Sequence, residues 1–424
     1  DRCLRRSPIL RFPSGEELQK ELEVLATELA APTARSVLRQ AIRKRWLVAL
    51  CLTTGLLVPP LAALRYLYGQ RVEQHQAAAL LHSRRSVAVV GLANPTRQPQ
   101  YAGFASAFTE LLGTELVVGE RLRRILPESV ARMKIDLGIP ETASFGPELL
   151  LQIRESLSAD LIVSGSILPE TAGHDRLLVR ISVTDTQTGT QLAGTVVSGS
   201  SGELFKLVTA AGSVLRQQLG LGELSEPQAT ALRAVRPTRP EVAQTYAQGR
   251  ELLRRFDAVG ARKLLEKVIA ADPDYSLGHF AMAEMWTALG YDEKAKAEAR
   301  RALEISSHLP REDRYLIEAR YREASKDWDK AISAYQTLLT FFPDSLEYGL
   351  YLANAQLASG QAALALETAR RLHQLGPSAD QDPRLAILEA RATSDAGDPQ
   401  AAYTLLGRAV RQGEAIRAPL LVAR

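Results

Sequence analysis

Residues 319–343 read ARYREASKDWDKAISAYQTLLTFFP, and residues 353–377 read ANAQLASGQAALALETARRLHQLGP. Each stretch begins with an alanine, has a second alanine 12 positions later and ends on a proline after 12 more. Gly249, Ala261 and Pro273 repeat the same spacing. Small residues at these positions predict two antiparallel helices that approach closely, and the proline predicts the end of the second helix.

The spacing recurs on a frame of about 34 residues over residues 238–424. A second and a fifth set are marked by Ala283, Ala295, Ala302 and by Ala390, Ala402, Ala409, and the closing proline of the second set moves to Pro310. This pattern resembles the tetratricopeptide repeat (TPR), whose unit is a pair of helices. The resemblance implies an α-solenoid of five repeats over residues 238–424.

A solenoid of helix pairs exposes a concave face, built from the first helix of each pair, that commonly binds peptides or partner domains. The candidate groove residues are Tyr246, Arg250, Met282, Tyr315, Tyr348 and Asn354. For any one of them, packing between helices is the commoner role. Asn354 resembles the asparagines that hold a peptide carboxylate in some chaperone-binding arrays, but lysines to match it are missing from the neighbouring repeat.

Residues 86–225 predict a mixed α/β domain. Strands are expected at 86–92, 115–118, 160–167, 176–184 and 191–198, and helices at 101–112, 120–134, 147–157 and 202–219. The opening SVAVVGLANP and the later block ADLIVSGSI…LLVRISVTDTQTG resemble the TolB-like amino-terminal domain of bacterial envelope and regulatory proteins. The resemblance implies a compact α/β sandwich.

Residues 46–64, WLVALCLTTGLLVPPLAAL, form a run of 19 residues without a charge. As a helix the run would reach roughly 28 Å, close to the thickness of a bilayer core. A transmembrane helix is therefore expected at 46–66, preceded by a basic juxtamembrane segment at 31–45. The single apolar run predicts a single-pass protein of the inner (plasma) membrane. Because arginine is in surplus before the run, the amino terminus is expected in the cytoplasm and residues 86–424 outside it.

Residues 1–30 predict a capped helix, with Ser14 as N-cap and Glu17 three positions later. Residues 3–18, CLRRSPILRFPSGEEL, resemble the end of bacterial serine/threonine protein kinase domains, although Ser7 stands where that family usually has Asp. The resemblance implies that Arg11 is the buried arginine that pairs with the glutamate closing the activation segment. Other kinase motifs do not occur in the sequence, so ATP and magnesium are expected only with an upstream kinase domain.

Charge and residue types restrict the chemistry. Residues 1–85 carry 14 basic and 7 acidic side chains, so the positive charge lies beside the apolar run and not on a nucleic-acid-binding face. Cys3 and Cys51 are the only cysteines. No catalytic triad, Cys/His pair or metal-ligand spacing occurs, so we expect no catalytic, cofactor or metal site in this sequence.

The expected fold class is multidomain α and α/β: one transmembrane helix, a TolB-like α/β sandwich and a TPR solenoid. The expected function is a membrane-anchored signalling protein whose repeat array binds protein partners and regulates a serine/threonine kinase, with homodimerisation as one means of coupling. We treat the sequence as a piece of a longer chain. A membrane-bound transcription regulator with an upstream winged-helix domain and a non-enzymatic envelope scaffold are the alternatives.

Overall fold

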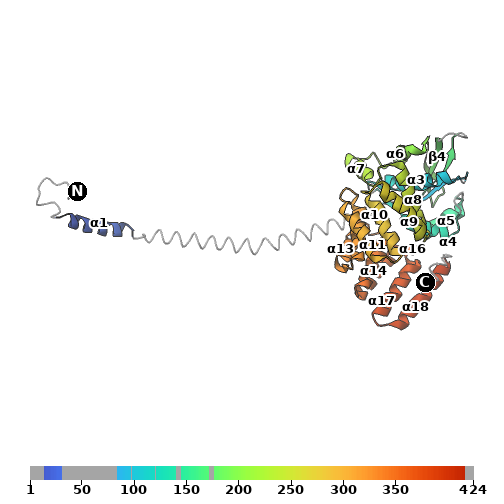
Figure 1. The fold of residues 1–424 in the computed structure, drawn as a ribbon. Coiled ribbons are helices and arrows are strands. Elements are labelled where there is room, and N and C mark those ends of the chain that lie inside the picture. The colour runs from blue at the N-terminus through green and yellow to red at the C-terminus, as the bar shows by residue number, and fades with distance from the viewer. Residues whose placement is uncertain are drawn as a thin grey trace. The chain divides into compact units, whose positions relative to one another are not determined.

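The computed structural model describes residues 14–30, 84–96, 98–119, 121–139, 145–170 and 176–415 (Figure 1). The chain divides into two compact units, residues 1–76 and 77–424. In the first unit, helix α1 spans Gly15–Ala30, and the Ser14 hydroxyl accepts a hydrogen bond from the Glu17 amide at 3.4 Å. This bond confirms the first half of the predicted cap. Leu22 and Leu25 of this helix are exposed.

The predicted fold class was wrong. The described chain is mostly helical with one small sheet, and none of its described helices combines the length and apolar character needed to cross a membrane. Its longest helix, at Pro99–Val117, has 19 residues and carries Glu110 and Glu115. It packs against the sheet. The segment predicted to span the membrane, residues 46–66, lies outside the described residues, as do Arg11 and residues 31–45.

The second unit contains one five-stranded sheet with the order β2-β1-β3-β4-β5. β1 pairs in parallel with β2 and β3, whereas β3, β4 and β5 form an antiparallel meander. The strands are β1 (Arg85–Ala93), β2 (Leu122–Arg124), β3 (Leu161–Pro169), β4 (Arg176–Asp185) and β5 (Gln191–Ser200). Four of the five predicted strands are thereby confirmed.

Helices cover both faces of this sheet. α3 (Pro99–Val117) and α6 (Leu204–Gln218, after the 3-10 turn η3 at Ser201–Glu203) share a buried cluster with β1, β3 and β4. α4 (Pro127–Asp136) and α5 (Pro147–Leu157) pack on the opposite face, against β1 and β3. The alternating apolar residues of β3 therefore have a helix layer on either side.

The strand predicted at 115–118 is absent, because these residues belong to the end of α3. Phe104, Phe108, Leu112 and Leu116 follow one another at helical spacing, and each is 1% exposed or less. This continuous apolar stripe outweighs the β-branched residues at 117 and 118. The next strand, β2, occupies part of the helix predicted at 120–134, and Pro127 begins α4 at its first position.

The remaining helices are the pairs of the predicted array, which is confirmed (Figure 1). After α7 (Glu226–Ala234), the pairs are α8 (Pro240–Arg254) with α9 (Ala258–Ala271), α10 (Ser276–Ala288) with α11 (Asp292–Glu304), α12 (Arg311–Ala324) with α13 (Trp328–Phe341), α14 (Leu346–Ala358) with α15 (Ala362–His373), and α17 (Pro383–Asp395) with α18 (Pro399–Ala415). A short helix, α16 (Pro377–Asp380), lies between the last two pairs.

The small residues of the repeat frame lie where the paired helices meet. Ala319, Ala331, Ala353 and Ala365 have no exposed surface. A side chain at Gly249 would place its Cβ 2.9 Å from the Leu265 Cδ2 atom across the α8–α9 contact. Larger residues would separate the helices, as the sequence pattern predicts.

The α/β part and the array share a core. Ala243 and Ala247 of α8 belong to the same buried cluster as Phe104 and Phe108 of α3. Gly103 permits this approach, because a Cβ there would lie 2.8 Å from the Gln248 Nε2 atom. Residues 77–424 thus form one compact unit. The domain boundaries at 86–225 and 238–424 stay predictions.

Candidate functional site

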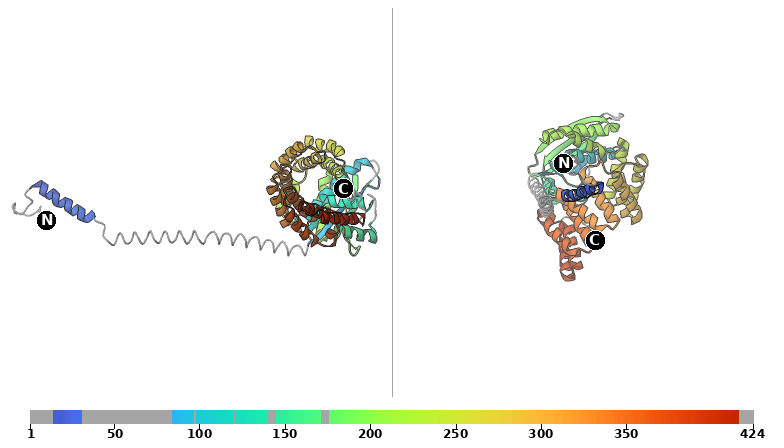
Figure 2. Two further views of the ribbon diagram at one scale, coloured as in Figure 1. Left: turned by 90° about the horizontal axis from the view of Figure 1, so that it is seen from below. Right: turned by 90° about the vertical axis from the view of Figure 1, so that its left-hand side faces the viewer.

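The inner side of the array faces the α/β part of the same chain. In the left view of Figure 2 the repeat helices follow an arc, with the blue-green segments of the α/β part against it. α3 and α4 pack on α8, and α16 contacts α5. β2 and α4 contact several repeats of the array, and we call residues 122–136 the bridging segment.

A group of carboxylates and guanidinium groups joins the α/β part to α8. Arg254 forms ion pairs with Glu110 of α3 and, at 3.5 Å, with Glu128 of the bridging segment. Arg250 pairs with Glu128 at 2.7 Å and also with Glu284 of α10. The two arginine side chains are only 13% and 9% exposed, so water weakens these pairs less than it weakens surface pairs.

The electrostatics of this group follow from burial and from the nearby cations. Burial alone would raise the pKa of Glu110, but the charges of Arg254 and Arg124 outweigh it and lower that pKa to about 2. Burial also opposes ionisation of Glu128, and again Arg254 and Arg250 outweigh it, so the Glu128 pKa is lowered. Both carboxylates are therefore ionised at neutral pH and hold the two parts together.

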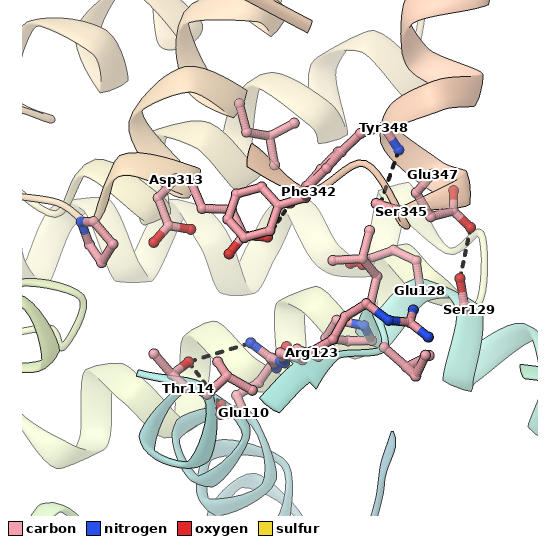
Figure 3. A pocket seen from close by; sticks show the side chains of 18 of the residues that line it. Glu110, Thr114, Arg123, Glu128, Ser129, Asp313, Phe342, Ser345, Glu347 and Tyr348 are labelled. Carbon is pink, nitrogen blue, oxygen red and sulfur yellow. Dashed lines mark hydrogen bonds and ion pairs between the residues drawn. The ribbon is translucent and has the colours of Figure 1, made fainter. Parts of the chain in front are cut away.

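A second set of polar contacts joins the bridging segment to the start of α14, which is in turn bonded to α17. Arg123 pairs with Asp344 at 2.7 Å, and the Ser129 hydroxyl donates a hydrogen bond of 2.7 Å to Glu347 (Figure 3). Glu347 also receives two hydrogen bonds from Arg384, at 2.7 and 2.9 Å. One carboxylate thus serves both the bridging segment and the last repeat, which fixes the two relative to each other.

An apolar contact lies between the two polar sets. Leu126, the N-cap of α4, packs against the buried cluster of α12, α13 and α14, which includes Tyr335, Leu338 and Tyr348. The sequence Leu126-Pro127 at the start of α4 therefore presents an apolar side chain to the array, between Arg123 and Glu128. The bridging segment occupies the array's inner face much as a bound peptide would.

The contact is not fully packed. A cavity of about 970 Å³ lies between the α/β part and the array, and Figure 3 shows part of its wall. The array contributes residues mainly from its first helices, including Tyr246, Phe280, Leu316 and Tyr348. This volume falls in the range of small-molecule binding sites.

Three of the predicted groove residues line this cavity: Tyr246, Arg250 and Tyr348. Tyr246 lies edge-on to Tyr275, with ring centroids 5.2 Å apart. The Tyr348 hydroxyl donates a hydrogen bond to Glu312, and burial raises its pKa well above the usual value. Arg250 holds Glu128, as described above. The structure thus brings these three residues together with the α/β part.

The other three predicted groove residues lie elsewhere. Met282 is buried in the core formed by α8 to α11. Tyr315 stacks on Phe341, with centroids 6.3 Å apart. The Asn354 side chain donates to the Leu350 carbonyl at 2.7 Å and accepts from Arg391 at 3.2 Å. Whether any of the six binds a partner stays a prediction.

The bridging segment was missed from the sequence, where it was predicted as part of one long helix. Its residues Arg123, Leu126, Glu128 and Ser129 make the contacts that close the inner face. A usable signal was present: two arginines and a leucine precede Pro127, which cannot lie inside a helix without breaking it. The partners of Glu128 and Ser129 lie 122 and 218 positions away, and the local pattern gave no signal of such pairing.

No family model matches the chain, and no curated protein matches it. Solved structures similar to it include the "MamA RS-1 ArsTM double mutant", at 13% identity over 41% of this chain and 96% of that one, with a TM-score of 0.31. A putative kinesin light chain from Podosopora anserina, with nearly identical TPR-like repeats, has 20% identity over 42% of this chain and 96% of that one, at a TM-score of 0.32.

A third similar structure is the LpoB C-terminal domain from Salmonella enterica, at 15% identity over 30% of this chain and 94% of that one, with a TM-score of 0.23. Likenesses at this level assign no function. The TPR-like architecture rests on the five helix pairs described above. Among the described residues, no cluster of three metal-ligating side chains occurs.

Proposed function

We propose that residues 77–424 are a protein-binding regulatory unit, in which a TPR-like array is closed by the α/β part of the same chain. The observation that carries this proposal is the bridging segment, whose Arg123, Leu126 and Glu128 each contact a different part of the array's inner face. Solenoids of this kind use that face for partners. A partner that binds there competes with the bridging segment, so binding and opening of the unit are coupled.

The energetics of the contact between the α/β part and the array bear on this coupling. The ion pairs at Arg250 and Arg254 are nearly buried, and opening exposes their charges to water, which offsets part of the cost of breaking them. The cavity leaves part of the contact unpacked, which lowers the stability of the closed form. A partner that replaces the bridging segment must offset the loss of the Glu128 pairs and of the Leu126 contact with its own binding free energy.

The test uses a lock across the contact. Ser129→Cys and Glu347→Cys place two thiols where the structure has a hydrogen bond of 2.7 Å, in a background where Cys3 and Cys51 are replaced by serine. A short thiol-reactive crosslinker then holds the unit closed. Displayed random peptides are selected against an opened variant, Arg123→Glu, and tested on the open, wild-type and locked proteins.

We expect selected peptides to bind the opened variant best, the wild type more weakly and the locked protein least. The doubly substituted protein without crosslinker is the matched control for the two cysteines. Equal binding to the locked and opened proteins would contradict the coupling. Failure to select any peptide against the opened variant would contradict the protein-binding role.

We further propose that this unit regulates an upstream serine/threonine kinase domain, which alone would bind ATP and magnesium. Support comes from the resemblance of residues 3–18 to the end of such domains. The reading frame upstream of Asp1 tests this assignment, because HRD and DFG motifs select a kinase and a helix-turn-helix selects a transcription regulator. Partner-induced dimerisation is the proposed means of coupling, and sedimentation with and without a selected peptide measures it. The predicted compartment of residues 86–424 stays a prediction.

A further inference from the structure

The cavity between the α/β part and the array has walls suited to a small organic molecule. Its volume is about 970 Å³. Aromatic side chains from several repeats line it: Tyr246, Tyr275, Phe280, Phe342 and Tyr348. Sites for small molecules typically combine such an apolar wall with a few polar groups that fix the orientation of the ligand.

Most of the charged groups in this wall already have partners in the protein. The lining includes eight arginines and eight carboxylates, so the cavity is balanced as a whole. Arg123 pairs with Asp344, Arg124 with Glu110, and Arg384 with Glu347. A ligand anion would have to compete with these carboxylates for each guanidinium group.

Asp313 differs from the other carboxylates of the wall. It lies in the first turn of α12, and its carboxylate points into the cavity (Figure 3). The structure gives it no hydrogen bond and no ion pair with any described residue. An acidic residue in the first turn of a helix commonly interacts favourably with the helix dipole. The Asp313 side chain, however, makes no hydrogen bond to the backbone amides of its own helix.

The groups that face Asp313 leave a negative region. Glu312 precedes it on α12 and adds a second negative charge, while Arg311 lies over the Phe341 ring, 4.3 Å from its centroid. Arg124 of β2 is the nearby cation from the α/β part, and it is engaged by Glu110 at 3.0 Å. The phenol groups of Tyr275 and Tyr348 interact electrostatically with the Asp313 carboxylate.

Burial, and then the charge of Glu312, raise the pKa of Asp313 to about 7, and Arg124 only partly offsets this rise. An acid in this state gains a favourable ion pair as soon as a cation enters. Aromatic faces such as those of Tyr348 and Phe342 also attract cations, and they pack against apolar carbon.

We propose that this cavity binds a small organic amine, whose ammonium group pairs with Asp313 and whose apolar body packs against Tyr348 and Phe342. A single carboxylate matches a single ammonium charge, and the neighbouring Glu312 adds to the attraction. The proposal is independent of the protein-binding role, because it concerns a cavity and a side chain that the bridging segment leaves unfilled.

The amine should bind more tightly as Asp313 ionises. Since the cation pairs only with the carboxylate form, binding lowers the pKa of Asp313 and releases a proton near neutral pH. For a group that titrates around pH 7, affinity rises about tenfold between pH 6 and pH 8. An amine of high basicity stays charged over this range, so the change reports the protein group.

The experiment is calorimetric titration of the full chain with 2-phenylethylammonium and hexylammonium, and with 2-phenylethanol and hexanol as neutral counterparts. Each is measured at pH 6 and pH 8, and at pH 7 in two buffers of different ionisation enthalpy. We expect the amines to bind at least tenfold more tightly than the alcohols at pH 8. We also expect proton release at pH 7.

Asp313→Asn removes the charge at nearly constant size, and Asp329→Asn is the matched control. Asp329 also lies in a first turn, that of the neighbouring helix α13, but it is exposed. We expect Asp313→Asn to lose at least tenfold in amine affinity together with the pH dependence, and Asp329→Asn to behave as the wild type. Proton release by the wild type needs no variant, so a folding defect in Asp313→Asn does not remove the test.

The proposal is overturned if neither amine binds more tightly than its alcohol, or if Asp313→Asn binds amines as the wild type does. Amine binding that is equal at pH 6 and pH 8 and releases no proton would also overturn it. That result would place the ammonium group at another carboxylate of the wall.

Discussion

At the scale of single residues, Glu110 joins two parts of the chain that lie far apart in the sequence. It binds Arg254, 144 positions later, and Arg124 of the bridging segment. Its lowered pKa, about 2, lies below the usual value of 4.5, so it stabilises the folded state fully above pH 4.5. That stabilisation is lost as the pH falls from about 4.5 towards 2.

Glu110→Gln should therefore destabilise the chain by roughly 3 kcal/mol at pH 7, because it leaves Arg254 buried with less opposite charge. Chemical denaturation followed by circular dichroism measures this difference. Glu251→Gln is the control, since Glu251 also contacts Arg254 but from the surface, where a pair contributes at most about 1 kcal/mol. Equal effects of the two variants would show that the Glu110 pairs do not hold the unit together.

The ionisation of Asp313 changes the stability of the folded state in the opposite direction to that of Glu110. Its pKa in the folded chain, about 7, lies above the usual value of 3.8, so the folded state is disfavoured increasingly as the pH rises from about 4 to 7. Asp313→Asn should have little effect on stability at pH 4 and should stabilise the chain by more than about 1 kcal/mol at pH 8.

Thermal unfolding of the wild type and Asp313→Asn, measured at intervals between pH 4 and pH 8, checks this sign. A difference in melting temperature that does not grow with pH would argue against a raised pKa at Asp313. A stabilising substitution at this position is what the amine site requires, because a binding residue held without a partner costs stability in the unbound protein.

At the scale of elements, the sequence was a good guide wherever one periodicity prevailed. The repeat helices and the meander of β3, β4 and β5 follow from small residues at fixed spacing and from alternating apolar residues. The errors lay at 115–124, where Val117 and Val118 favour a strand locally. The helix forms there because it buries the apolar stripe of Phe104, Phe108, Leu112 and Leu116. A prediction from a few neighbouring residues does not include this tertiary burial.

The close approach of paired helices can be tested at Gly349 of α14. A Cβ at this position would lie 2.2 Å from the Leu372 Cδ2 atom of α15, so Gly349→Ala requires the buried Leu372 side chain or the two helices to move. We expect a loss of roughly 1–3 kcal/mol despite the better helix propensity of alanine. Denaturant titration of the full chain measures the loss.

Gly407→Ala is the matched control, because Gly407 lies inside α18 and a Cβ there meets only the Arg411 side chain, at 3.6 Å. Here the gain in helix propensity should prevail and stabilise the chain by up to about 1 kcal/mol. The same chemical change should thus have opposite signs at the two positions. If both substitutions stabilised the chain, the α14–α15 contact would be able to accommodate the extra methyl group at little cost.

At the scale of the whole molecule, the candidate site could not be predicted from sequence alone. Tyr246, Arg250 and Tyr348 were identified as groove residues from their place in the repeats, and they do face the array's inner side. What fills that side is the chain's own bridging segment. Arg123 pairs with Asp344 and Glu128 with Arg250 only because the α/β part and the array pack together. The sequence pattern of either region gives no information on which residues of the other region it will contact.

Closure of the unit can be tested by exchanging charges across it. Arg123 and Asp344 lie 2.7 Å apart and are 22% and 21% exposed. Arg123→Glu or Asp344→Arg alone places like charges at this contact and should destabilise the closed form by about 2 kcal/mol. The double variant restores an opposite pair, so it should recover most of that loss.

Amide hydrogen exchange is the decisive measurement, because it reports opening separately from global unfolding. The Ile125 amide, which donates to the Val87 carbonyl within the α/β part, lies in the bridging segment and is protected while this part is folded. Each single variant should speed exchange at the α14 amides that the closed contact shields, and leave Ile125 protected. If Ile125 and α14 lose protection together, the bridging segment is part of one inseparable core, and a partner cannot open the array without unfolding the α/β part.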